Sequence, residues 1–174
     1  MRDLIFVTCT YRRPGRLDFF RRHIRTLISQ IEHYHWIVVE DGELPDPELS
    51  VLLEGWNSRY LQIGPTRDEG GGQRNLAFEC IRDQRLDGVV YNLEDDNLVH
   101  PELADELRRV SKVGIVPIGN LGPNGIERPI VVNGQLVRWD SDRAERKYPV
   151  TKGGFAFESR LIFEAKSQIG RAHV

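Results

Sequence analysis

Short apolar runs punctuate the first two thirds of the chain, and each has the character of a buried strand. They are rich in β-branched residues and stay apolar at consecutive positions, as strands covered on both faces of a parallel sheet do. These runs are Leu4–Val7, Trp36–Val39, Gly88–Tyr91 and Gly114–Ile118. We therefore expect a largely parallel sheet at the centre of the protein.

Helical periodicity fills the gaps between these runs. Apolar residues recur at helical spacing from Leu17 to Ile31, again from Leu76 to Ile81, and after Pro101. The alternation of strand and helix predicts an α/β, Rossmann-like sheet with helices on both faces and right-handed crossovers. The arginines of the first helix should mostly lie on its solvated face: Arg16, Arg21, Arg22 and Arg25.

The pattern changes after Ile118, where glycines and a proline mark a loop. Two apolar runs then flank Asn133-Gly134, and Asn-Gly in that position is a strong hairpin signal. The second half should thus hold a small antiparallel part, within a single domain that we place at residues 1–168. Residues 169–174 correspond to what a common sequencing-adapter stretch encodes, so we expect a non-native tail there and a domain incomplete at its C-terminus.

Composition restricts the partners. The chain has 174 residues, 40% of them hydrophobic, which is enough for a core, and its 24 basic and 26 acidic residues nearly cancel. No global field favours nucleic acid or an anionic membrane. The apolar runs are far shorter than a membrane span, so we expect no membrane segment and a cytoplasmic location. Nothing in the pattern indicates an oligomeric state.

Cysteines and histidines offer little chemistry. Cys9 and Cys80 lie inside apolar stretches, which favours reduced core thiols over a disulfide framework. The histidines lack metal-ligand spacing and are expected to be ordinary surface or half-buried groups: His23, His33, His35 and His100.

Three consecutive carboxylates, Glu94, Asp95 and Asp96, directly follow the third apolar run. Ligands of open α/β sheets bind beyond the carboxyl ends of the strands. Adjacent carboxylates repel one another unless a cation or hydrogen-bond donors offset their charge, and oxygen ligands in this position suit Mg²⁺ or Mn²⁺. The alternative is a solvated acidic loop that caps the helix after Pro101.

Three further segments should converge on the same edge: Thr8–Tyr11, Glu40–Gly42 and the glycine loop Gly70–Asn75. Glycine backbone at a helix N-terminus can approach a phosphate closely, and Arg74 adds a planar donor fork. The loop matches neither the dinucleotide fingerprint nor a P-loop, and by itself it equally suits a flexible solvent loop.

Seven motifs occur in the order and approximate spacing of a known family. They are VTCTYRR, WIVVEDG, GGQRNLAF, GVVYNLEDDN, VGIVPIGNLG, IERP and YPVTKGGFAF. From about Leu4 to Ile162 the chain resembles glycosyltransferase family 43, which contains the eukaryotic β-1,3-glucuronosyltransferases. The resemblance implies a GT-A nucleotide-sugar fold, a UDP-sugar donor, a carbohydrate acceptor, Mn²⁺ (or Mg²⁺) at a DXD-type motif, and inversion at the anomeric carbon.

The same resemblance implies roles for individual residues. Asp96 is the metal ligand, while Glu94 and Asp95 lie around the donor sugar and the ribose. The remaining positions are the nucleotide-lining Thr10 and Tyr11, the uracil-side Asp41, the donor-side Arg74 and Arg146, and the acceptor-side Glu127.

The chain also departs from the family pattern. Glu94 stands where the family has Asp, and Thr151 stands where the family has an aspartate after Pro-Val, so glucuronic acid is not secured as the donor sugar. A second donor-site arginine would fall near Glu69, with Arg67 as a substitute. The catalytic base is expected beyond the present C-terminus, and Glu158 is not nominated because its strand-like segment gives its side chain no preferred side.

Two other functions stay open. One is a nucleotide-sugar binding module that does not turn over, natural or truncated. The other is a metal-dependent phosphoryl enzyme of the same fold class.

Overall fold

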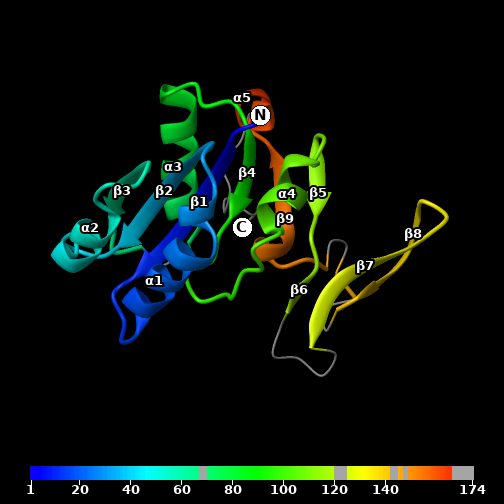
Figure 1. Cartoon of the computed structure of the whole chain (residues 1–174), viewed down its shortest axis with the longest axis horizontal. Helices are drawn as coiled ribbons and strands as arrows, with labels where there is room; N and C mark the ends of the chain where they lie inside the picture. Colours follow the sequence, from blue (N-terminus) through cyan, green and yellow to red (C-terminus); the bar gives the residue numbers. More distant parts are fainter. Residues whose placement is uncertain (67–69, 120–124, 142–144, 147–148, 166–174) are drawn as a thin grey trace.

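A six-stranded sheet forms the centre of the molecule (Figure 1). The computed structural model describes residues 1–66, 70–119, 125–141, 145–146 and 149–165. In sheet order the strands are β3 (Ser58–Ile63), β2 (Tyr34–Asp41), β1 (Leu4–Tyr11), β4 (Val89–Asn92), β9 (Phe155–Glu158) and β5 (Val113–Ile115). The first four of these are parallel, which confirms the predicted parallel core.

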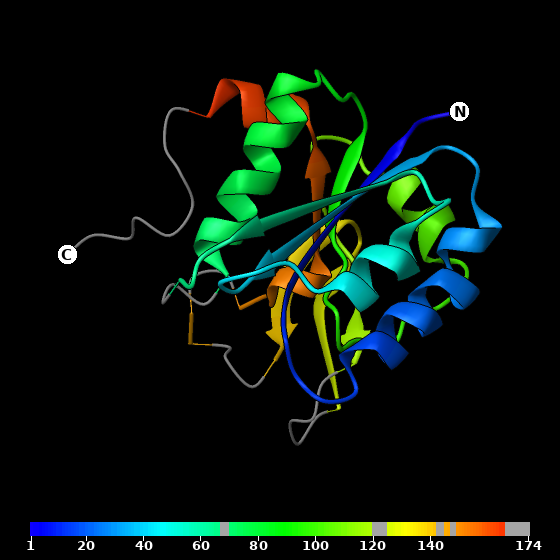
Figure 2. The same cartoon turned by 90° about the vertical axis from the view of Figure 1, so that its left-hand side faces the viewer.

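Helices cover both faces, as predicted. Figure 2 shows α1 (Arg16–Thr26), α2 (Pro47–Leu53) and α4 (Leu103–Arg108) on one side, with α3 (Gly71–Asp83) and α5 (Arg160–Glu164) on the other. Successive residues of a strand point to opposite faces. Leu4 and Phe6 of β1 therefore pack under α1 and α4, whereas Ile5 and Val7 pack under α3. Two short 3₁₀ helices complete the helical elements: Ile28–Gln30 after α1, and Lys152–Gly154 before β9.

The fourth apolar run does not extend the parallel row. It divides into β5 and β6 (Ile118–Gly119), and β5 does not pair with β4. The place beside β4 belongs to β9, which is antiparallel to both β4 and β5. A strand from much later in the chain thus lies between β4 and β5.

The predicted hairpin is confirmed. β7 (Ile126–Val132) and β8 (Gln135–Asp140) are antiparallel and, with β6, form a separate three-stranded sheet that extends away from the main one in Figure 1. Asn133 (φ 50°) and Gly134 (φ 77°) both have positive φ, as a type I′ turn requires.

Two polar residues of α1 are buried, contrary to prediction. Arg16 is only 2% exposed; its Nη1 lies 2.6 Å from Glu40 Oε1, and its Nη2 pairs with Asp46. His23 is 1% exposed, because it lies on the same face as the buried Phe20. Arg21, Arg22 and Arg25 are exposed as expected.

Several other predictions can be compared with the structure. Cys9 and Cys80 are free thiols, and burial, the largest contribution, raises the pKa of Cys9 to about 11.

None of the helices in the described ranges has the length and apolarity needed to cross a membrane. Arg67, Glu69 and the predicted tail at 169–174 lie outside the described residues.

Candidate functional site

The acidic segment continues along the end of β1. Register pairs Val7 with Asn92, so β4 stops before β1 does, and Leu93 N–H donates to the Val7 carbonyl at 3.0 Å. The Thr8 hydroxyl then donates to the Leu93 carbonyl at 2.8 Å. These contacts place Glu94, Asp95 and Asp96 beside the last residues of β1, at the carboxyl edge of the sheet.

Gln73 fixes the N-terminus of α3 to the same edge. Its side-chain amide is buried and donates to the carbonyl oxygens of Thr10 and Val39, both at 2.8 Å. Those carbonyls belong to adjacent strands, so one side chain ties α3 to both β1 and β2. Gln73 was not among the predicted site residues, although it lies within the GGQRN motif that indicated the loop.

Arg74 and Glu94 meet as the predicted convergence requires. Arg74 is 5% exposed; it donates from Nη2 to Glu94 Oε1 at 3.1 Å and from Nη1 to the Gly70 carbonyl at 3.0 Å. Gly70 has a φ of 88°, a left-handed backbone conformation that favours glycine. Burial raises the pKa of Glu94 against the opposing effects of Arg74 and Lys152.

The carboxylate of Asp95 is held by two side chains of the protein, those of Arg13 and Thr10. Arg13 makes a two-pronged contact with its carboxylate, at 2.6 Å from Nη1 and 2.8 Å from Nη2, and the Thr10 hydroxyl donates to it at 2.6 Å. The hydrogen bond to Asp95 is the first cause of the raised pKa of Arg13. Thr10 therefore contributes to the site through Asp95, and Arg13 is a member of it that was not predicted.

Asp96 differs from its two neighbours. Its side chain is exposed, and no hydrogen bond or ion pair joins it to any residue within the described ranges. Those ranges also contain no group of three His, Cys, Asp or Glu side chains arranged to hold a metal. A single free carboxylate nevertheless fits Mn²⁺ or Mg²⁺, because these ions commonly take one or two protein carboxylates and complete their shell with phosphate and water oxygens.

Tyr11 and Asp41 lie side by side in the register of β1 and β2. Tyr11 is 57% exposed, and the Arg13 guanidinium carbon lies 4.8 Å from the centroid of its ring. Asp41 is half-buried and accepts from the Thr66 N–H at 2.8 Å and from the Thr66 hydroxyl at 2.5 Å. The exposed ring and the oriented carboxylate together offer a surface that suits a planar base.

The buried side chain of His23 contacts the backbone of the acidic segment. Its ring Nε2 donates to the Glu94 carbonyl at 2.9 Å. Burial, the largest effect, lowers the pKa of His23 below its ordinary value, while this hydrogen bond and the charges of Asp95 and Asp96 act in the opposite direction. The spacing from Phe20 placed His23 on the apolar face of α1, and that signal could have identified it.

The later motifs also reach this edge. The Tyr91 hydroxyl donates to the Gly153 carbonyl, and a Cβ at Gly153 would lie 3.3 Å from Glu94 Cγ. Glu127 is buried and accepts from the Ser141 hydroxyl and the Thr151 N–H, both at 3.2 Å. The segment after β8 thus packs on the acidic segment, with Glu127 held inside rather than presented to solvent.

Among the described residues, neither Arg146 nor Glu158 has a contact with this cluster. Arg146 is exposed, and the structure gives it no contact with the acidic segment among the described residues. Glu158 pairs in register with Val89 at the start of β4, at the opposite end of that strand, and forms ion pairs with Arg2 and Arg160. Glu158 is therefore not placed to act at the candidate site.

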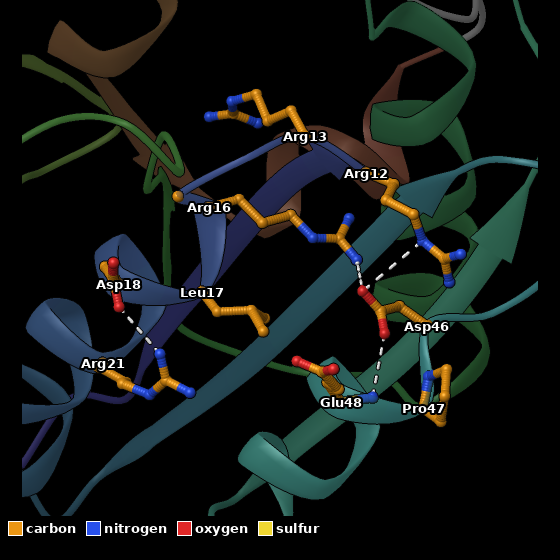
Figure 3. A pocket seen from close by; sticks show the side chains of 10 residues that line it. Arg12, Arg13, Arg16, Leu17, Asp18, Arg21, Asp46, Pro47 and Glu48 are labelled. Atoms are coloured by element: carbon orange, nitrogen blue, oxygen red, sulfur yellow. Dashed lines mark hydrogen bonds and ion pairs between the residues drawn. The ribbon is translucent and has the colours of Figure 1, made fainter.

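A hollow of about 530 Å³ lies beside the site, between the starts of α1 and α2 (Figure 3). Its charges are largely paired within the chain: Arg16 with Asp46, and Arg21 with Asp18 at 2.8 Å. Arg12 is more loosely placed, 3.7 Å from Asp46. None of the three acidic residues that follow β4 lines this hollow, and we assign the candidate site to the sheet edge instead.

The sheet order, the acidic segment and the small antiparallel sheet define a GT-A nucleotide-sugar transferase fold. Crystal structures support that class. S. aureus TarS 1-349 in complex with UDP has a TM-score of 0.59 at 15% identity, over 93% of this chain and 48% of that one. 4-Diphosphocytidyl-2C-methyl-D-erythritol synthase has a TM-score of 0.58 at 13% identity, and the match covers 100% of this chain and 82% of that one. At these identities the likeness shows the fold alone.

Within that class, residues 24–173 match glycosyltransferase family 43, and the chain belongs to this family. Human galactosylgalactosylxylosylprotein 3-beta-glucuronosyltransferase 2 is 33% identical over 171 residues, covering 90% of this chain and 53% of the relative. Galactosylgalactosylxylosylprotein 3-beta-glucuronosyltransferase P of Drosophila melanogaster is 30% identical over 173 residues, which cover 92% of this chain and 36% of the relative. The chain thus spans about half or less of the length of these relatives.

Proposed function

We propose that this chain carries the donor-binding part of an inverting glycosyltransferase. It binds a UDP-sugar at the carboxyl edge of the sheet and transfers the sugar to an acceptor hydroxyl, with Mn²⁺ or Mg²⁺ held through Asp96. The observation that carries the proposal is the convergence of four family motifs on one edge, with Asp96 exposed and without a partner among the described residues.

Each residue has a role that its surroundings suit. The exposed Tyr11 ring stacks on the base, Asp41 accepts from the uracil, and Arg74 donates toward the donor sugar. A bound Mn²⁺ would offset the charge that develops on UDP as the glycosidic bond breaks. Arg13 and Gln73 hold the surrounding backbone and carboxylates in place.

Glucuronic acid is the first donor sugar to test, since both curated relatives carry glucuronosyl transfer in their names. Arg74 and Lys152 supply positive charge close to Glu94, which suits a donor that bears a carboxylate. Thr151 and Glu94 depart from the family pattern. UDP-glucose and UDP-N-acetylglucosamine are therefore the comparison donors.

Calorimetry with UDP, CDP and ADP, each with and without Mn²⁺, tests the binding step. We expect UDP to bind most tightly and its affinity to increase with Mn²⁺. Equal affinity for the three nucleotides would contradict the assignment of the base site. A radiolabelled-donor assay with several carbohydrate acceptors tests the transfer step, and release of inorganic phosphate would favour a phosphoryl enzyme instead.

A nucleotide-sugar binding module that does not turn over is the second candidate. The observation that favours it is the state of two glutamates: Glu127 is buried and bonded to its own chain, and Glu158 lies at the wrong end of β4. Inverting transfer needs a base to take the proton of the acceptor hydroxyl. Tight Mn²⁺-dependent UDP binding without sugar transfer to any acceptor would select this candidate.

A further inference from the structure

We propose that Arg13 makes divalent-metal binding at Asp96 conditional on the nucleotide, by keeping Asp95 out of the set of metal ligands. The inference rests on the proposed function, because it concerns the same donor site. Arg13 acts here as a positioning residue, since it contacts Asp95 and the Tyr11 ring rather than a reacting atom.

The contact between Arg13 and Asp95 occupies both carboxylate oxygens. Nη1 lies 2.6 Å from Oδ2 and Nη2 lies 2.8 Å from Oδ1, while the Thr10 hydroxyl takes a further acceptor position on Oδ2 at 2.6 Å. Asp95 is only 6% exposed. A paired guanidinium and carboxylate are mutually stabilised, and such two-pronged contacts fix orientation as well as charge. Asp95 is therefore not available to a cation while Arg13 holds it.

The same arrangement sets the charge beside Asp96. Arg13 forms an ion pair with Asp95, and Arg74 forms one with Glu94, so Asp96 is the carboxylate of the three without an ion-pair partner among the described residues. Mn²⁺ or Mg²⁺ at a single exposed carboxylate is bound weakly in water, and the phosphate oxygens of UDP would supply the missing ligands. Without Arg13, adjacent Asp95 and Asp96 would both be free, and a cation could bind them with no nucleotide present.

Arg13 also reaches the predicted base surface. Its guanidinium carbon lies 4.8 Å from the Tyr11 ring centroid, and in Figure 3 its side chain points away from the ion pairs of the neighbouring hollow. One guanidinium thus contacts both the predicted uridine surface and the acidic segment. The contacts of Arg13 give a physical link between nucleotide binding and the carboxylates.

Titration of Mn²⁺ followed by electron paramagnetic resonance, with and without UDP, tests this inference. In the wild type we expect weak Mn²⁺ binding alone and a strong increase with UDP. Arg13→Leu should raise the nucleotide-free affinity for Mn²⁺ by about tenfold and reduce the increase with UDP, as a loss of coupling between two ligands. The double variant Arg13→Leu/Asp95→Asn should return the nucleotide-free affinity to the wild-type value.

Arg12→Leu is the matched control, because Arg12 is adjacent but contacts Asp46 instead. An unchanged or lower nucleotide-free affinity in a folded Arg13→Leu protein overturns the inference, even if UDP and Mn²⁺ still bind the wild type together. If Arg13→Leu fails to fold, Asp95→Asn decides: unchanged Mn²⁺ affinity with UDP supports the inference, and a tenfold loss shows that Asp95 is itself a ligand. A wild type that binds no Mn²⁺ with UDP overturns the proposed function as well.

Discussion

The carboxylate of Asp41 accepts two hydrogen bonds from Thr66, one from its backbone N–H and one from its hydroxyl. A side chain held at both oxygens presents a fixed acceptor at the end of β2, beside the exposed Tyr11 ring. Thr66 was not foreseen from the sequence, and it explains how a half-buried carboxylate keeps one orientation before any ligand binds.

Asp41→Asn should weaken UDP binding while leaving Mn²⁺ binding largely intact, since Asp41 ends a different strand from the acidic segment. Loss of a charged hydrogen bond costs about 1.5–3 kcal/mol, roughly a tenfold to hundredfold loss of affinity. Calorimetry measures the change, and Thr66→Ser, which retains the hydroxyl, is the control. Equal binding of UDP and CDP to the wild type would show that Asp41 does not select the base.

Asp96→Asn should remove most of the Mn²⁺-dependent part of UDP affinity, because the diphosphate and the carboxylate must share one cation. The control is Asp105→Asn, an exposed carboxylate on α4. Calorimetry with and without Mn²⁺ gives the result. Identical Mn²⁺ dependence in the wild type and the Asp96 variant would rule out the metal bridge.

His23 should make the protein sensitive to mild acid. Burial holds its pKa in the folded state below the ordinary value of 6.5. Its contribution to stability is thus complete above pH 6.5 and is lost as the pH falls toward the folded pKa, because the unfolded chain takes up the proton first. His23→Gln keeps a donor for the Glu94 carbonyl and should reduce the drop in Tm between pH 7.5 and 5.5. His100→Gln, at an exposed position, should leave that drop unchanged.

Gln73→Leu should lower the free energy of unfolding by about 2–4 kcal/mol, because two buried carbonyl groups lose their donor. UDP affinity should fall as well, since α3 would no longer be tied to β1 and β2. Urea unfolding and calorimetry measure both effects. Gln30→Ala is the control, because the Gln30 side chain bonds to exposed backbone. A loss no larger than in that control would contradict the role assigned to Gln73.

Local patterns predicted the parts of the fold that depend on neighbouring residues. The buried runs, the helical faces and the Asn133-Gly134 turn are of this kind. The Asp46-Pro47 pair is also a helix start, with Asp46 accepting from the Glu48 N–H, and it could have predicted α2. β3 was missed because its six residues are all partly exposed or exposed, and so lack a continuous apolar run.

Side-chain partners from distant segments were harder to predict. The solvated face assigned to Arg16 was wrong because its partners, Glu40 and Asp46, come from β2 and the loop after it. Likewise, the YRR motif showed two arginines without showing which one turns toward Asp95. The motifs predicted that the segments of Arg74, Glu94 and Asp41 converge on one edge of the sheet, as they do in the structure, but the pairing of charges there depends on three-dimensional contacts.

The position of β9 has a consequence for how the chain folds during synthesis. β4 is complete at Asn92, yet the strand that covers its outer edge begins only at Phe155. Until then the backbone N–H and C=O groups on that edge have no strand beside them, and exposed strand edges can pair with other chains. Such long-range pairing also slows folding. Nascent chains that end between β4 and β9 should therefore aggregate readily and become soluble once residues 155–158 have emerged from the ribosome.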